Sequence, residues 1–405
     1  MRTNRAAVPR SQLRRGRTLV GALLALTLAL GADVIGGPST TVAPSHHPSV
    51  ALTSYPSGTV RRSEPSGLAP PTSSSLAGFT LDYVNDFLGK SVLGGWGVYS
   101  GVPGSDPGGQ FSPGHVSVSG GLLHLSSWSD PLYGGTWVTG GLCHCGFAHT
   151  YGAFFVRTRA TGPGPTVVEL LWPANNQWPP EIDFAETDGG VGALSATVHW
   201  GASNNKDQRR LAIDLTQWHT FGVVWTPGQL LYVVDGRVWG TVSRPSEIPN
   251  IPMTLDLQQQ TWCLSSWACP LSPQEMLVDW VAEFKMTGPL TVNVGPFSLT
   301  GPTLSAALQD QVQSAAADLA YLHCASASVL GYANPTTPRS LATSQSLRWA
   351  QATAALLRAD VSRLTHRVVT TRVQGLGATN LVGPTSTTLG QAQNRRVVVT
   401  TCSPG

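Results

Sequence analysis

The sequence predicts an all-β sandwich followed by a small α+β domain, and three observations lead to this prediction. Gly and Pro are plentiful, at 44 and 30 residues, while charged residues make up only 12% of the 405. Between about residues 79 and 287, short segments of alternating polarity are separated by turn residues. After Pro289 the pattern changes to apolar residues that recur every three or four positions.

The N-terminal segment has the pattern of an export signal. A basic start is followed by an apolar run from Leu19 to Leu30 and by the small residues Gly31 and Ala32. This run is too short to span the ~30 Å of a bilayer core comfortably, although an uncleaved anchor is the alternative. We expect a signal peptide over residues 1–32 and a secreted or cell-wall associated protein with no stable membrane span.

Residues 33–77 are rich in Ser, Thr, Pro and Gly, which predicts a linker. The formal charge of +3 depends on six arginines that precede Thr18; without them, 19 basic residues face 22 acidic ones. A chain with this balance has no basic face to hold nucleic acid or anionic lipid.

The sandwich is expected over residues 78–288. Its strands are predicted from alternating polarity, and pairs such as Gly120-Gly121 and Asp235-Gly236 mark the turns between them. The predicted strands include His115–Val118, Leu122–Ser127, Ala153–Thr158, Ala193–Trp200, His219–Trp225 and Leu230–Val234.

The α+β domain is expected over residues 289–405. A helix is predicted from Leu304 to Leu322 and a second near Leu347–Leu357. Strands are predicted at Val292–Val294, Val329-Leu330, Val368–Val373 and Val397–Thr401.

Six cysteines in an exported chain favour disulfides. Cys263 with Cys269 is the easiest local bridge, and Cys324 with Cys402 would close the C-terminal part. Cys143-His144-Cys145 lacks a second ligand pair at metal-site spacing, so a bridge or free thiols are favoured there over a metal.

The hexapeptide Glu181-Ile182-Asp183-Phe184-Ala185-Glu186 places three carboxylates in an otherwise apolar strand. Strict alternation puts Glu181 and Asp183 on one face and Glu186 on the other, and one β-bulge returns Glu186 to the first face. Buried like charges hold some acids protonated and others ionised, which suits a pair of carboxyls that cleaves glycosidic bonds. A calcium site is the alternative, but calcium loops are hydrophilic and Gly-rich.

Tryptophans lead directly into the acids, and sugar rings stack on aromatic faces. His199 alternates with Ser195 and Thr197 on the polar side of its strand. The expected substrate-binding residues are Trp172, Trp178, His199, Trp137 and Trp262. No cofactor or metal is expected at the site, and a structural calcium elsewhere is left open.

The segment from about Phe79 to Thr287 resembles glycoside hydrolase family 16. The resemblance rests on the E-x-D-x-x-E form of Glu181 to Glu186 and on Trp178-Pro179, His199-Trp200, Trp218 to Phe221 and Trp225 to Gly228. It implies a concanavalin A-like β-jelly roll and a retaining, endo-acting hydrolase of β-glucan, most often β-1,3-glucan. It also implies that Glu181 is the nucleophile, Asp183 its helper and Glu186 the acid/base.

The C-terminal part resembles the outer-membrane protein A-like domain, through Gly331-Tyr332 and the run Leu389 to Val397. In that family an Asp and an Arg hold a peptidoglycan stem peptide; here Asn334 and Trp349 occupy those positions, with Arg348 one residue earlier. The sequence therefore predicts a glycoside hydrolase acting on a polysaccharide, with possible wall contact through this domain. The alternatives are a transglycosylase acting on a wall glycan and a non-catalytic glycan-binding wall protein.

Overall fold

A computed structural model describes residues 55–89, 93–104, 106–263, 268–299, 301–335 and 339–403. The expected signal peptide and residues 33–54 of the expected linker lie outside these ranges. Among the described residues, no helix combines the length and the apolar character that crossing a bilayer requires.

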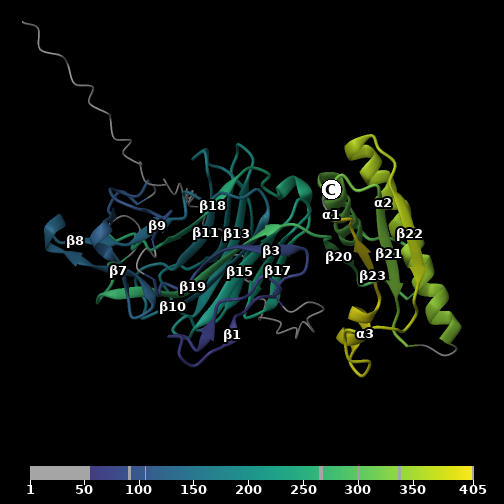
Figure 1. The fold of residues 1–405 in the computed structure, drawn as a ribbon, viewed down its shortest axis with the longest axis horizontal. Coiled ribbons are helices and arrows are strands. Elements are labelled where there is room, and N and C mark those ends of the chain that lie inside the picture. The colour runs from purple at the N-terminus through teal and green to yellow at the C-terminus, as the bar shows by residue number, and fades with distance from the viewer. Residues whose placement is uncertain are drawn as a thin grey trace, which may run out of the picture.

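Two large, mostly antiparallel sheets face each other, as the sequence predicts (Figure 1). The first has ten strands, most of them in the order β17-β16-β15-β10-β19-β7-β8-β5, with β3 beside β19 and β6 beside β7. Its strands are β3 (Phe79–Asn85), β5 (Gln110–Phe111), β6 (Val116–Ser119), β7 (Leu122–Asp130), β8 (Thr136–Thr139), β10 (Gly152–Ala160), β15 (His219–Trp225), β16 (Leu230–Val234), β17 (Arg237–Val242) and β19 (Gln274–Met286).

The second sheet carries the acidic hexapeptide and has the order β14-β13-β12-β11-β18-β9-β4. Its strands are β4 (Gly97–Val98), β9 (Gly141–Cys143), β11 (Val168–Pro173), β12 (Glu181–Glu186), β13 (Ala193–Trp200), β14 (Asn205–Ala212) and β18 (Met253–Gln258). Single 3₁₀ turns lie at Pro113–His115, Pro131–Tyr133 and Pro245–Glu247.

The core between the sheets is filled by alternate residues of both. Phe154 and Val156 from β10 meet Ile182 and Phe184 from β12, and all four are fully buried. Because side chains alternate along a strand, this packing sends the intervening polar residues of β12 to the opposite face of its sheet.

Residues 55–77 contradict the predicted linker. They form β1 (Thr59–Val60) and β2 (Leu68–Ala69), and Leu76 is buried against the outer face of the ten-stranded sheet. Trp280 Nε1 donates a hydrogen bond to the Leu68 carbonyl at 2.9 Å. Composition alone does not predict these strands, because they are held in place by contacts with residues about 210 positions away.

The C-terminal part is an α+β unit whose four-stranded sheet has the order β20-β23-β21-β22. Helix α2 is longer than predicted, because no Gly or Pro interrupts the chain beyond the predicted apolar stretch. The elements are β20 (Thr291–Val294), α1 (Ala306–Tyr321), β21 (Ser326–Tyr332), α2 (Arg339–Thr365), β22 (Thr370–Gly375), α3 (Thr388–Asn394) and β23 (Arg396–Thr400).

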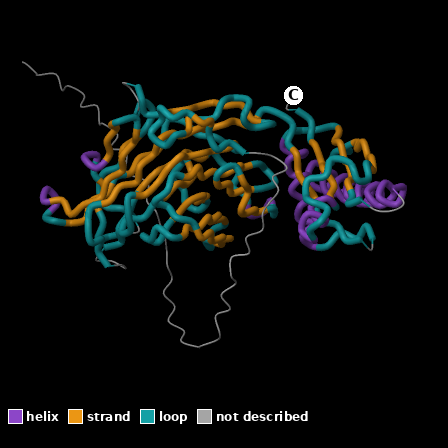
Figure 2. The backbone as a smooth tube through the Cα atoms, turned by 90° about the horizontal axis from the view of Figure 1, so that it is seen from below, coloured by secondary structure: helices purple, strands orange, loops and turns teal. Residues whose placement is uncertain are grey.

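The two parts of the chain share one apolar core. Phe155 and Phe284, on the outer face of the ten-stranded sheet, belong to the same buried cluster as Leu308 and Val312 of α1. Gly228 N donates to Asp318 Oδ1 of α1 at 2.9 Å. Figure 2 shows the helical part beside the end of the sandwich.

All six cysteines form disulfides, which confirms the expected Cys263–Cys269 and Cys324–Cys402 bridges. The third joins Cys143 to Cys145, so bridging, and not free thiols or a metal, describes this pair.

Candidate functional site

A bulge in β12 brings the three acids to one face of the seven-stranded sheet. Glu181 lies opposite His199, Asp183 opposite Thr197, and Glu186 opposite Ser195, with the register shifting between Asp183 and Glu186. Ile182, Phe184 and Ala185 fill the core beneath. The kink predicted from the hexapeptide is thus present, and it restores the third acid to the side of the first two.

Glu181 is the most tightly held of the three carboxyls. It is fully buried, and Trp178 Nε1 donates a hydrogen bond to its Oε2 at 2.7 Å. Asp183 is also buried, at 1% exposure, and neither of its oxygens has a donor among the described residues. Glu181 Oε1 is likewise without a donor, so a proton held between these neighbouring carboxyls would satisfy both.

Burial raises the pKa of all three acids, because a carboxylate loses its hydration there. The Trp178 hydrogen bond opposes this rise at Glu181, while the negative charge of Glu186 adds to it. The positive charge of Lys206 opposes the rise at Glu186. The three groups therefore titrate as a set that retains protons to a higher pH than ordinary carboxyls.

His199, expected among the substrate-binding residues, lies against the middle acid, Asp183. Its Nε2 is 3.6 Å from Asp183 Oδ2, and its Nδ1 is 2.6 Å from Asn204 Oδ1. Burial lowers the pKa of His199, which favours the neutral ring. One ligand atom each from Glu181, Asp183 and His199 lie within 4.8 Å of one another, so these three residues could hold a cation.

Glu186 is only half-buried and opens onto a pocket of about 230 Å³. The pocket is lined by polar residues of β13 and β14 and by one of the predicted tryptophans. They include Thr197, His199, Lys206 and Trp262. The third acid therefore reaches a space that a substrate or a water molecule can occupy, while the first two are enclosed.

The other predicted aromatic residues divide between two places. Trp172 and Trp178 pack together with Val168 and Leu170 on the face that carries the acids, and the Trp178 ring lies 5.9 Å from the His199 ring. Trp137 lies on β8 of the other sheet and is not among the residues that line the Glu186 pocket. The structure therefore gathers four of the five predicted contacts near the acids.

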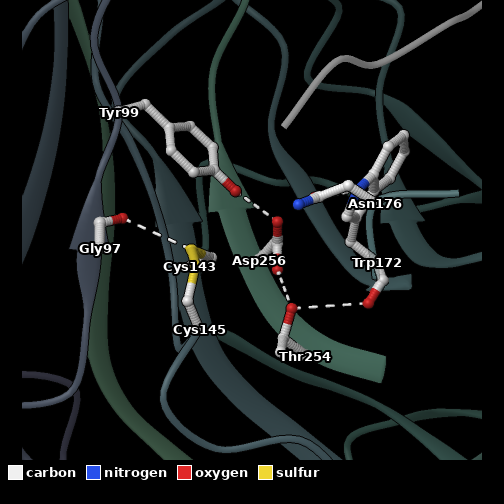
Figure 3. Close-up of a disulfide and its surroundings, with 8 residues drawn as sticks. All are labelled: Gly97, Tyr99, Cys143, Cys145, Trp172, Asn176, Thr254 and Asp256. Carbon is white, nitrogen blue, oxygen red and sulfur yellow. Dashed lines mark hydrogen bonds between the residues drawn. A yellow bond between two sulfur atoms is a disulfide. The ribbon is translucent and has the colours of Figure 1, made fainter. Parts of the chain in front are cut away.

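A fourth buried acid, missed in the sequence, lies on the same face. Asp256 of β18 and Asp183 both pair with Leu170, one on each side of it. Figure 3 shows Asp256 between the Tyr99 hydroxyl, which donates to it, and Thr254 Oγ1, which donates at 2.9 Å. Burial raises the pKa of Asp256 to about 7. The one available signal was an acid alternating with Leu255 and Leu257.

A fifth carboxyl points the other way. Glu169 of β11 is fully buried, lies opposite Ala185, and has no hydrogen-bond partner for either oxygen among the described residues. Burial raises its pKa well above the usual range, so this side chain is held neutral. It borders the bulge from the core side and does not reach the polar face.

Comparison with known proteins finds similarity to a known family within the sandwich. Residues 110–282 match the family model of glycosyl hydrolases family 16. The chain is 30% identical over 107 residues to the endo-1,3-1,4-beta-glycanase ExsH of Rhizobium meliloti, covering 25% of this chain and 23% of that protein. It is 28% identical over 150 residues to EglC of the same organism, covering 35% and 31%.

Solved structures of similar fold include the laminarinase catalytic domain of Thermotoga maritima, at 18% identity and a TM-score of 0.46, covering 51% of this chain and 98% of that one. The endo-beta-1,3-glucanase of Pyrococcus furiosus is 20% identical, with a TM-score of 0.44, covering 51% and 94%. The chain thus spans less than a third of the length of the two curated relatives, and the family match falls on the segment that carries the acids. Residues 110–282 are therefore a domain of glycosyl hydrolases family 16.

Proposed function

We propose that this protein is a retaining, endo-acting glycoside hydrolase that cleaves β-glucan, with β-1,3-glucan as the preferred chain. The observation that carries the proposal is the bulge that aligns Glu181, Asp183 and Glu186 on one face. The family match of residues 110–282 supports the same class of reaction, and so does the similarity to two endo-1,3-1,4-beta-glycanases.

The environments of the two glutamates suggest their roles. Glu181 is enclosed and fixed by Trp178, which suits a nucleophile that must approach one carbon atom in a set direction. Glu186 faces an open pocket, which suits a group that exchanges protons with a leaving group and then with water. Asp183 lies between them, so its charge and any proton it shares adjust the ionisation of Glu181.

In the first step, the Glu181 carboxylate attacks the anomeric carbon while Glu186 gives its proton to the glycosidic oxygen. The bond between that carbon and that oxygen breaks, and the sugar remains as an ester of Glu181. In the second step, Glu186 takes a proton from water as the water oxygen attacks the same carbon. The ester bond breaks, Glu181 is released as a carboxylate, and the configuration at the anomeric carbon is retained.

The proposal is tested by Glu181→Gln, with Glu169→Gln as its matched control. Both substitutions replace a fully buried glutamate on adjacent strands, but only Glu181 faces the proposed cleft. We expect Glu181→Gln to abolish release of reducing ends from laminarin while binding is kept, and Glu169→Gln to retain cleavage. Full activity in Glu181→Gln would overturn the assignment, and a first product of inverted configuration by NMR would overturn the mechanism.

Hydrolysis and transfer use the same ester of Glu181, and differ in whether water or a sugar hydroxyl attacks it. Mass spectrometry of early products distinguishes them, because transfer gives chains longer than the substrate. Fragments of many lengths would indicate internal cleavage. If the wild-type protein binds glucan but releases no product, the glycan-binding alternative is correct.

We further propose export and contact with the cell wall. The three disulfides support an oxidising destination. An outer-membrane protein A-like role for the C-terminal part rests on its α+β architecture and on the motifs around Gly331 and Arg396.

Binding of a peptidoglycan stem peptide by this domain is disfavoured. Asn334 Oδ1 accepts a hydrogen bond from Asn394 Nδ2, and Trp349 is stacked on Phe297 and buried, so neither side chain is available to a ligand. We expect full-length Glu181→Gln protein to co-sediment only weakly with purified peptidoglycan. Tight binding that is lost in Asn334→Ala would contradict this expectation.

A further inference from the structure

A second cleft lies at the junction between the sandwich and the C-terminal part. It has a volume of about 460 Å³, within the ~300–1,000 Å³ range of ligand pockets. Its walls come from β16 and β17 on one side and from β20, α1 and α3 on the other. Figure 1 shows this junction beside β17, in the sheet that does not carry the acids.

The wall of this junction cleft is polar but almost uncharged. Six lining residues offer hydroxyl or amide groups, and none of their side chains is hydrogen-bonded to another described residue. They are Tyr55, Gln229, Thr241, Ser243, Thr291 and Asn293. Thr241, Thr291 and Asn293 are exposed, so a ligand can reach the cleft from solvent.

Two further lining residues are buried with unused polar atoms. Ser314 is fully buried, and its Oγ has no partner among the described residues. Arg396 is 5% exposed, and its Nε and Nη1 have no hydrogen-bond partner among the residues that the structure describes. A buried donor without a partner lowers the stability of the folded protein, and a ligand with hydroxyl groups can supply the missing partner.

The cleft carries one cationic side chain and no acidic one, and that cation already makes two contacts within the protein. Arg396 is the one charged residue among those lining the cleft. Its guanidinium lies 4.3 Å from the centre of the Tyr332 ring, and Nη2 donates to the Asn380 carbonyl at 2.9 Å. Leu231, Val238 and Pro296 add apolar surface. Hydroxyl-binding groups beside apolar patches match the two faces of a neutral sugar.

We propose that the junction cleft binds a neutral saccharide segment of the polysaccharide that the acidic cleft cuts; this rests on the proposed function. The two sites lie on different sheets, so one protein can hold a second run of glucan while the first is cleaved. Two linked sites bind a polymer more tightly than either alone, without any new contact at the acids.

The test uses full-length Glu181→Gln protein and two probes, particulate β-1,3-glucan and a laminarin oligosaccharide. Thr241→Trp fills the junction cleft from an exposed edge strand, and Thr59→Trp is the matched control on an exposed strand outside it. We expect two equivalents of oligosaccharide per chain in the control and one in Thr241→Trp. Apparent affinity for the particles should fall about tenfold or more in Thr241→Trp.

One equivalent in the Thr59→Trp control, or equal particle binding in the two variants, would overturn the proposal. Asn293→Ala, an exposed truncation, replaces Thr241→Trp if the larger side chain lowers the thermal midpoint. Laminarin hydrolysis by the wild-type protein is measured separately. If the wild type cleaves laminarin but the Thr241→Trp and Thr59→Trp variants bind glucan equally, only the junction site is refuted. If the wild type does not cleave laminarin, the proposed function is refuted.

Discussion

The hydrogen bond from Trp178 to Glu181 makes the pH dependence of the reaction a direct test of the site. Trp178→Phe keeps an aromatic ring but removes the Nε1 donor that lies 2.7 Å from Glu181 Oε2. That bond lowers the pKa of Glu181 against the larger effect of burial, because it stabilises the carboxylate form. Without it, the nucleophile holds its proton to a higher pH.

The size of the effect follows from the charge on the acceptor. A hydrogen bond to a charged group contributes roughly 1.5–3 kcal/mol, and one pKa unit corresponds to about 1.4 kcal/mol. The acid limb of the profile of kcat/KM against pH should therefore move upward by about 1–2 units. Below the limb, each unit of this movement reduces kcat/KM about tenfold.

The assay is kcat/KM on a soluble β-glucan oligosaccharide between pH 4 and 9. Trp172→Phe is the matched control, since its Nε1 donates to Asn176 Oδ1 at 3.1 Å and not to an acid. The acid limb of the kcat/KM profile of Trp172→Phe should lie at the same pH as that of the wild type. Coinciding limbs for Trp178→Phe and wild type would refute the reasoning, and equal shifts in both variants would trace the effect to lost ring packing.

Three further predictions concern Asp183, Asp318 and the Cys324–Cys402 bridge. Asp183→Asn should lower kcat at least about a hundredfold, the low end of acid–base effects, with little change in oligosaccharide binding by calorimetry; an unaltered kcat would remove Asp183 from the mechanism. Burial raises the pKa of Asp318 to about 7, so wild-type stability should fall as pH rises from 4 to 8. Asp318→Asn should abolish up to about 4 kcal/mol of that fall, seen as a flatter melting profile, whereas Asp310→Asn on the same helix should not. Loss of the Cys324–Cys402 bridge, which closes 78 residues, should cost roughly 4–5 kcal/mol in denaturant unfolding, and an unchanged midpoint would contradict the entropic estimate.

Much of the sandwich was predictable because its signals are local. Alternating polarity gives the bounds of Ala193–Trp200, His219–Trp225 and Leu230–Val234 as the structure has them. The bulge was also predictable, since three acids and two large apolar residues in six positions cannot satisfy a buried face otherwise.

The features that the sequence did not predict depend on contacts between residues far apart in the chain. The Tyr99–Asp256 hydrogen bond joins residues 157 positions apart, and no local pattern marks either as a partner of the other. The order of residues 55–77 likewise depends on the outer face of the ten-stranded sheet, which is assembled from strands that follow later in the chain. Helix α3 is short and has no apolar stripe of its own.

The apolar cluster that runs from Phe155 and Phe284 into α1 means that the sandwich has an apolar surface on that side, which the C-terminal part covers. Cutting the chain after Thr287 would expose these rings to water and leave Gly228 N without Asp318. Such a fragment should self-associate, and the isolated C-terminal part should do the same. Heat should therefore melt both halves in a single calorimetric transition, so neither half can be exchanged between proteins without redesigning the surface it leaves behind.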